Sequence, residues 1–163
     1  MKIAIYTDGG CHGNPGPGGW AYIIMNTKKV LAEKWGADMF TTNNRMELTA
    51  VTNAMEAIQE LLPTLGKRPP DISVYTDSQY VQKGISEWIV LWKKNGWRNS
   101  ERKPVKNKDL WQKLDALAAS VSKLPIQWEW VRGHSGNAYN ELCDNMTQVA
   151  INSLKRNAIA DGE

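Results

Sequence analysis

The stretch Ile3-Ala4-Ile5-Tyr6-Thr7-Asp8-Gly9 decides how the chain is arranged, because Ile72-Ser73-Val74-Tyr75-Thr76-Asp77-Ser78 repeats its pattern much later in the sequence. Both stretches carry β-branched and aromatic residues and stop at a turn signal, which predicts two strands. If these strands lie side by side, Asp8 and Asp77 leave the same end of a sheet on the same face, because side chains alternate along a strand. Two adjacent carboxylates repel, and one pKa rises unless a cation lies between them. We therefore expect a metal ion at this acidic corner.

Length and composition limit the class of protein. The 163 residues are enough for about one domain with a buried core. No apolar run approaches the ~20 residues that cross a bilayer, and no signal-peptide pattern follows Met1. The two cysteines, Cys11 and Cys143, are too few for a disulfide scaffold and lack zinc-type spacing. We expect a monomer in the reducing cytoplasm, without a membrane partner.

The net charge of +3 is unevenly distributed along the chain. Residues 83–113 hold nine Lys or Arg against three Asp or Glu, and tryptophans alternate with the basic residues there. Cations that recur together with flat aromatic rings favour contact with a nucleic acid. The alternative is a solvated basic face, and the helical spacing of Trp88 and Trp92 also fits partial burial in a core.

Residues 9–19 are rich in Gly and Pro, so they cannot form a helix. They also lack the Gly-Lys-Ser/Thr ending of a Walker loop. They fit either a wide turn between strands or a loop that approaches a nucleic-acid strand, with Cys11 and Asn14 facing it. Strands at 20–25 and 30–35 would then complete an antiparallel meander with the first strand.

The first long helix is predicted after Thr41, because Thr and Asn at 41–44 are good N-cap residues and Pro63 ends the pattern. An apolar stripe with helical spacing runs through it, formed by Leu48, Val51, Met55, Ile58 and Leu62. Glu47 falls in the first turn, where complementing the helix dipole is the alternative to binding a metal. A strand, this helix and a second strand fit a crossover that pairs residues 3–9 and 72–78 in parallel.

The remaining elements alternate between helix and strand. Ser78 caps a short helix that runs to Trp92, residues 109–119 form another helix, and residues 126–131 form a strand. A glycine-flanked loop at 132–136 contains His134, which alone would be weak evidence for a site. The last helix starts near Asn140 and carries Asp144 in its first turn, where dipole complementarity is again the alternative. Beyond Lys155 we expect a polar tail.

Taken in chain order, these motifs resemble ribonuclease HI, the bacterial type 1 ribonuclease H. The resemblance covers nearly the whole chain and rests on Thr7-Asp8-Gly9 with Cys11 and residues 13–19, and on residues 42–48, 76–81, 103–107, 133–136 and 140–144. It implies an α/β, ribonuclease H-like fold, in which a five-stranded mixed sheet combines an antiparallel meander with parallel strands and has helices on both faces. It implies a single ribonuclease H domain over residues 1–155, followed by a tail over 156–163.

The resemblance also implies an endonuclease that cleaves the RNA strand of RNA–DNA hybrids, leaving 5′-phosphate and 3′-hydroxyl ends. It assigns metal binding and catalysis to Asp8, Glu47, Asp77 and Asp144, and a mobile catalytic role to His134. It places substrate contacts at Cys11, Asn14, Thr42, Asn43, Asn44, Gln79, Trp88, Lys93, Lys94, Trp97 and Asn107, with Thr42 and Asn107 near a DNA-strand phosphate. The chain departs from the family at residues 145–147, which read Asn-Met-Thr where Glu-Leu-Ala is common, and at Gly10, where Ser is common.

Four carboxylates offer hard oxygen ligands, which suit Mg²⁺, or Mn²⁺ as a substitute. Two such ions cancel four negative charges, whereas one ion would leave the scissile phosphate facing an anionic site. A two-metal mechanism therefore fits, in which one ion activates water and the other stabilises the leaving 3′-oxygen, with His134 relaying a proton or assisting product release. Two rival functions are another metal nuclease on the same scaffold, such as a resolvase or an integrase, and a non-catalytic hybrid-binding module. The presence of all four acids argues against the module.

Overall fold

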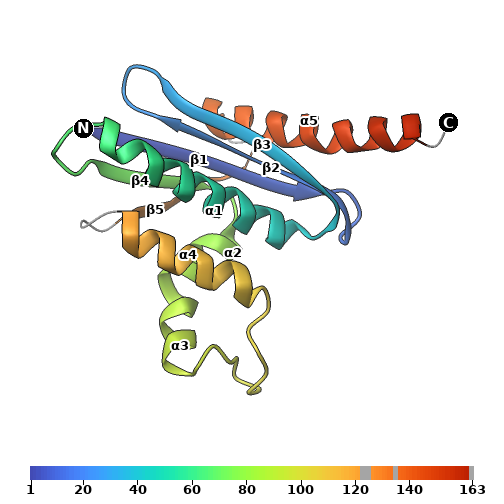
Figure 1. The fold of residues 1–163 in the computed structure, drawn as a ribbon. Coiled ribbons are helices and arrows are strands. Elements are labelled where there is room, and N and C mark those ends of the chain that lie inside the picture. Colours follow the sequence, from blue (N-terminus) through green and yellow to red (C-terminus); the bar gives the residue numbers. More distant parts are fainter. Residues whose placement is uncertain (122–125, 134–135, 162–163) are drawn as a thin grey trace.

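A mixed sheet forms the centre of the molecule in the computed structural model, which describes residues 1–121, 126–133 and 136–161 (Figure 1). Five strands are hydrogen-bonded in the order β3-β2-β1-β4-β5. Their bounds are β1 Lys2–Cys11, β2 Gly16–Met25, β3 Val30–Thr41, β4 Asp71–Thr76 and β5 Gln127–Trp130. The first three strands form an antiparallel meander, and β4 and β5 join them in parallel. The predicted five-stranded mixed sheet is confirmed.

Helices cover both faces of this sheet (Figure 1). On one face, α1 (Asn43–Leu61) packs on β1 and β2, with α4 (Lys108–Val121) beside it. On the other face, α5 (Ala138–Asp161) packs on β1, β2 and β3. A short 3₁₀ turn, Leu62–Thr64, follows α1. Within the described residues, no helix combines the length and the apolar character that a membrane span requires.

The main core lies between the sheet and α1. Four residues of the apolar stripe predicted for this helix are buried there, together with Ile3, Ile5 and Ile24 of the sheet and Trp111 and Leu114 of α4. The fifth, Leu62, follows the end of α1 and is partly buried. Burying each such side chain stabilises the fold by about 1.5–3 kcal/mol. Because the stripe permits only one face of α1 to meet the sheet, burial also sets the direction in which its polar residues point.

A basic lobe, which we define as residues 84–107, projects from the body of the molecule (Figure 1). It continues from α2 (Gln79–Lys83) through a π-helical turn (Gly84–Trp88) into α3 (Ile89–Lys94). The Ser78 hydroxyl accepts a hydrogen bond from the Val81 amide at 3.2 Å, so the predicted cap is confirmed. A Cβ atom at Gly84 would overlap the Trp111 ring, so the absence of a side chain lets the lobe pack against α4.

The structure corrects the extent of the turn between the first two strands. β1 continues to Cys11 and β2 begins at Gly16, so the predicted wide turn over residues 9–19 is reduced to residues 12–15. The glycines of this segment pair across the two strands, with Gly10 opposite Gly19 and Cys11 opposite Gly18. Gly19 also lies against α5, where a Cβ atom would come within 2.9 Å of the Thr147 carbonyl oxygen. Glycine here permits close packing rather than breaking the strands.

The predicted placement of Glu47 and Asp144 in the first turns of their helices was wrong. Helix α1 begins at Asn43 and α5 at Ala138, so neither Glu47 nor Asp144 lies in a first turn. The helix dipole acts mainly on the first turn, so the dipole explanation for these two acids loses its basis. At its other end, α5 continues through Lys155 to Asp161 and includes residues that the sequence assigned to a polar tail.

Candidate metal and nucleic-acid site

Three acidic side chains meet at one end of the sheet. The parallel register places Thr7 beside Thr76, so the residues that follow, Asp8 and Asp77, emerge next to each other. Carboxylate oxygens of Asp8, Glu47 and Asp77 all lie within 4.8 Å of one another. The convergence of Asp8 and Asp77 expected from the repeated strand motif is therefore observed, and Glu47 completes the cluster.

Glu47 reaches this cluster because the start of α1 lies directly on Gly9. A Cβ atom at Gly9 would overlap the backbone of Met46 and Glu47, so no other residue fits without moving the helix. The Gly9 amide donates a hydrogen bond to Glu47 Oε1 at 2.6 Å, and the Thr76 hydroxyl donates to Oε2 at 3.5 Å. The two strands thus hold the carboxylate of a helix that covers one face of the sheet.

Burial and mutual repulsion make Asp8 and Glu47 hard to ionise. Asp8 is 4% exposed and Glu47 is 7% exposed. Burial, followed by the charge of Asp77, raises the pKa of Asp8 to about 8. Burial and the charges of Asp8 and Asp77 likewise raise the pKa of Glu47 well above its usual value. Buried carboxylates in such a group need a positive partner to stay ionised. A hard divalent cation fits this set of oxygen donors.

Asp144 lies close to the cluster but is not one of the three acids within 4.8 Å. Its side chain is half-buried on α5, and its charge contributes to the raised pKa of Asp8. Thr147, one turn further along α5, partly offsets the rise in the pKa of Asp8 as a hydrogen-bonding neighbour, a contact that sequence reasoning missed. The sequence signal that could have indicated this contact is the spacing of three residues between Asp144 and Thr147. His134 lies outside the described residues, so its predicted role stays a prediction.

Several predicted substrate contacts surround the turn at residues 12–15. The Cys11 thiol donates to the carbonyl oxygens of Gly16 at 3.2 Å and Thr41 at 3.3 Å. The Asn43 amide donates to Asn14 Oδ1 at 3.1 Å, which ties the turn to the start of α1. Among the other predicted contacts, Asn44 is exposed on α1 and Gln79 is exposed two residues after Asp77. The structure therefore gathers these residues at the acidic end of the sheet.

Arg45 joins the two residues predicted to lie near a DNA-strand phosphate. Its amide donates to the Thr42 hydroxyl at 3.3 Å, and its guanidinium donates to Asn107 Oδ1 at 3.2 Å. The same guanidinium binds both carboxylate oxygens of Asp109, at 3.1 and 2.9 Å. Asn107 in turn donates to the Tyr80 hydroxyl at 3.1 Å. Sequence reasoning missed Arg45, because the partners of its guanidinium lie more than sixty positions away.

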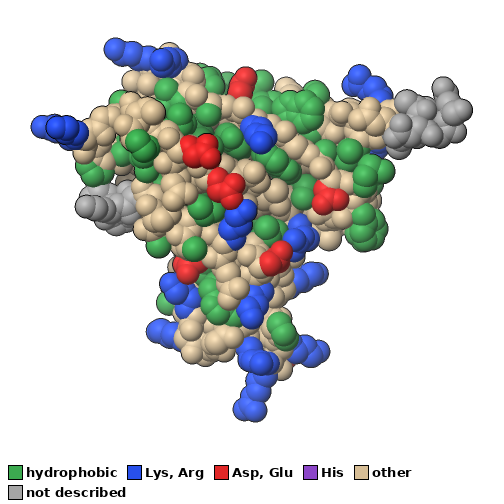
Figure 2. Space-filling model, in the orientation of Figure 1, with side chains coloured by type: hydrophobic (Ala, Val, Ile, Leu, Met, Phe, Trp, Pro, Cys, Tyr) green, Lys and Arg blue, Asp and Glu red, His purple; other side chains and the backbone are tan. Residues whose placement is uncertain are grey.

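The tryptophans of the basic lobe serve mainly to hold it together. Trp92 packs between Trp88 and Trp97, with ring centroids 6.0 and 6.4 Å away, and it forms an edge-to-face pair with Trp111 whose ring centroids are 5.4 Å apart. Trp88 and Trp97 are half-buried, so each keeps some accessible ring surface. Lys and Arg side chains gather around the outside of the lobe (Figure 2). Lys94 is exposed, as is Lys93, which pairs with Asp115 at 3.2 Å.

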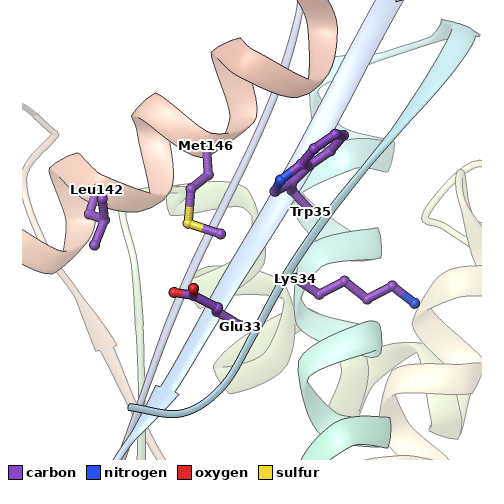
Figure 3. A pocket seen from close by; sticks show the side chains of 5 residues that line it. All are labelled: Glu33, Lys34, Trp35, Leu142 and Met146. Carbon is purple, nitrogen blue, oxygen red and sulfur yellow. The ribbon is translucent and has the colours of Figure 1, made fainter. Parts of the chain in front are cut away.

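A hollow of about 450 Å³ lies on another part of the surface, between β3 and α5. Figure 3 shows its lining residues, Glu33, Lys34, Trp35, Leu142 and Met146, with the Lys34 side chain directed away from the hollow. None of the predicted site residues lines it. The acidic cluster therefore lies outside this hollow, at the end of the sheet.

Sequence comparisons identify relatives that extend over nearly the whole chain. The sequence model of the RNase H family matches residues 1–152. A ribonuclease H of Treponema denticola is 49% identical over 162 residues, covering 94% of this chain and 99% of the relative. One from Dechloromonas aromatica is 52% identical over 153 residues, covering 94% of this chain and 95% of the relative.

Solved structures share the fold. LC9-RNase H1, described as a type 1 RNase H, aligns with a TM-score of 0.74 at 30% identity, over 93% of this chain and 72% of that one. LC11-RNase H1, solved in complex with an RNA/DNA hybrid, aligns with a TM-score of 0.73 at 23% identity, over 94% of this chain and 99% of that one. The second likeness is evidence for the fold alone.

Proposed function

Since the chain belongs to the ribonuclease H family, we propose that it is an endonuclease that cleaves the RNA strand of RNA–DNA hybrids by two-metal-ion hydrolysis. The products would carry 5′-phosphate and 3′-hydroxyl ends. The observation that carries the mechanism is the meeting of Asp8, Glu47 and Asp77 within 4.8 Å at the end of the sheet. Three carboxylates offer hard oxygen ligands there, and burial raises the pKa of Asp8 and Glu47, so the cluster suits a divalent cation that stabilises their ionised forms.

We propose Asp8, Glu47, Asp77 and Asp144 as the metal ligands, with Mg²⁺ as the ion and Mn²⁺ as a substitute. When bound, such ions activate water and stabilise the leaving 3′-oxygen. The chain contributes by holding the ligands, because Gly9 and Thr76 hold Glu47 by hydrogen bonds and Thr147 lowers the pKa of Asp8. We assign His134 the role of relaying a proton or assisting product release, which suits the usual pKa of histidine.

Substrate selection would use two sets of contacts. For the RNA strand, polar groups around the turn would meet 2′-hydroxyls in the minor groove; we assign this role to Cys11, Asn14, Asn43, Asn44 and Gln79. For the DNA strand, Thr42 and Asn107 would bind a phosphate, and the basic lobe would add contacts from Trp88, Lys93, Lys94 and Trp97. Few of these groups can read a base edge, so sequence preference should be slight.

We further propose that the chain acts as a cytoplasmic monomer, with residues 1–155 as its ribonuclease H domain. Both cysteines are free thiols, which agrees with a reducing compartment. Cys143 is buried, its thiol donates to the Tyr6 carbonyl oxygen at 3.4 Å, and burial raises its pKa. A thiol in such surroundings is unreactive and serves packing.

The decisive experiment compares four end-labelled duplexes in Mg²⁺: a hybrid labelled on the RNA strand, the same hybrid labelled on the DNA strand, duplex DNA and duplex RNA. Cleavage of the RNA strand of the hybrid alone is the expected result. Cleavage of duplex DNA at a similar rate would favour a resolvase or integrase type of nuclease. Binding of the hybrid without any cleavage would favour the non-catalytic module.

A further inference from the structure

Strands β2 and β3 lose their regular register near the acidic end of the sheet. Gly18 pairs with Asp38 and Gly16 pairs with Thr41, so Met39 and Phe40 together lie opposite one residue of β2. Two residues facing one is the arrangement of a β-bulge, which bends a strand and redirects its side chains. The Phe40 amide donates to Asp38 Oδ1 at 3.1 Å, which stabilises the local backbone.

The redirected side chains are large, apolar and exposed. Phe40, the single phenylalanine of the chain, is 74% exposed, and Met39 is 55% exposed. We call this pair of residues the apolar wedge. Neither side chain belongs to the core between the sheet and α1. Single exposed apolar side chains are common in proteins, whereas contiguous ones mark binding surfaces.

The apolar wedge is continuous with the surface that we propose for the hybrid. The next residue, Thr41, accepts a hydrogen bond from the Cys11 thiol, and Thr42 caps α1. Asn43 then contacts Asn14 of the turn. Asp38 places a carboxylate beside the wedge, and this negative charge would repel a phosphate. The part of a nucleic acid that fits here is therefore its uncharged surface of sugars and bases.

We propose that Met39 and Phe40 pack against sugars and bases of the bound hybrid in its minor groove. The inference rests on the proposed function and adds an apolar contact to the polar and basic ones. A-form-like duplexes present a wide, shallow minor groove that displays sugars and base edges. In the minor groove of DNA, apolar side chains of other proteins insert between base steps, and an aromatic ring that stacks on a base contributes enough to change affinity about fivefold to a hundredfold.

Salt dependence separates this contact from an ionic one. Removing a phosphate-binding cation flattens the dependence of affinity on salt, whereas removing an apolar side chain lowers affinity by the same factor at every salt concentration. The experiment measures binding of a labelled hybrid to wild type, Phe40→Ala, Met39→Ala and Phe40→Trp over a series of salt concentrations, in chelator so that no cleavage occurs. Val30→Ala is the matched control, because Val30 lies at the opposite end of the same strand and is 43% exposed.

We expect Phe40→Ala to weaken binding about fivefold or more with an unchanged salt slope, Met39→Ala to weaken it less, and Phe40→Trp to retain affinity. Val30→Ala should bind like wild type, and the exposed positions should leave the unfolding midpoint of all variants unchanged. Wild-type affinity in Phe40→Ala, or a flatter salt slope, would overturn the inference. If a wedge variant differs from wild type in the sedimentation of the free protein but not in its affinity for the hybrid, the apolar wedge contacts other protein molecules instead. Failure of wild type to bind hybrid would overturn the proposed function as well.

Discussion

Gly9 is the residue on which the position of Glu47 depends most directly. It lacks the side chain that would displace α1, and its amide holds the Glu47 carboxylate at 2.6 Å. Asp8 and Asp77 need no such support, because the parallel register of β1 and β4 already places them side by side. Within the cluster, therefore, strand pairing positions two acids and one glycine positions the third.

Replacing Gly9 with alanine should displace the start of α1 and move Glu47 out of place. We expect a loss of about 1–3 kcal/mol in the free energy of unfolding, as in other overpacked sites, and a loss of hybrid cleavage of at least about a hundredfold. Gly10→Ala is the matched control, because its Cβ atom would meet only the Thr147 methyl group at an ordinary 3.7 Å. Equal activity of the two variants would show that the overlap at Gly9 is relieved without moving Glu47.

Replacing Asp77 with asparagine removes one charge from the cluster and preserves its shape. We expect cleavage to be abolished while hybrid binding is retained. Because the charge of Asp77 raises the pKa of both Asp8 and Glu47, the free energy of unfolding in chelator should stay equal or rise by about 1 kcal/mol. Asp71→Asn, an exposed change at the start of the same strand, serves as the control. Cleavage near the wild-type rate in Asp77→Asn would contradict the proposed role.

The sequence predicted the helices and strands whose hydrophobic patterns lie within a short stretch of the chain. The repeated strand motif predicted β1 and β4 and the meeting of their acids, and the apolar stripe predicted α1. The sequence pattern could not predict the extension of α5, because a contact with a distant residue supports that helix. Gln148 Oε1 and Lys155 Nζ lie 2.9 and 2.6 Å from the His12 ring nitrogens. The link from Arg45 to Asn107 was missed for the same reason.

The basic lobe is the element whose function is most open to a direct test. We expect Lys93→Gln with Lys94→Gln to weaken hybrid binding and to lower the slope of log affinity against log salt by about one for each phosphate that the variant no longer neutralises. The matched control replaces Lys28 and Lys29, two exposed lysines in the turn between β2 and β3. A slope equal to that of wild type would identify the lobe as a solvated surface, the alternative that its charge pattern left open.

Across the molecule, the acidic cluster and the basic lobe occupy different places. Acids from β1, α1 and the end of β4 gather in a largely buried cluster. Exposed Lys and Arg side chains cluster on the lobe (Figure 2). A polyanion can therefore approach the lobe while the acids remain inside, and the proposed cations at the cluster would remove the repulsion between the acids and the substrate.

This arrangement predicts an unusual pH dependence for the metal-free protein. An unfolded aspartate loses its proton near pH 4, whereas the folded state keeps the proton of Asp8 until about pH 8. Between these values the unfolded state binds fewer protons, so the contribution of Asp8 to stability falls as pH rises. In chelator, urea unfolding should give a lower free energy at about pH 8 than at about pH 5, and Asp77→Asn should show a smaller decline. An increase in wild type across this range would contradict the burial of repelling acids.

The claim that a divalent cation stabilises the acidic cluster can be tested by measuring the free energy of unfolding of wild type during a titration with Mg²⁺ at about pH 8. We predict that Mg²⁺ restores the stability that is missing in chelator, by about 2.7 kcal/mol when its concentration is a hundred times the dissociation constant, and that Asp77→Asn gains far less. An equal gain in both proteins, or no gain in wild type, would contradict the claim.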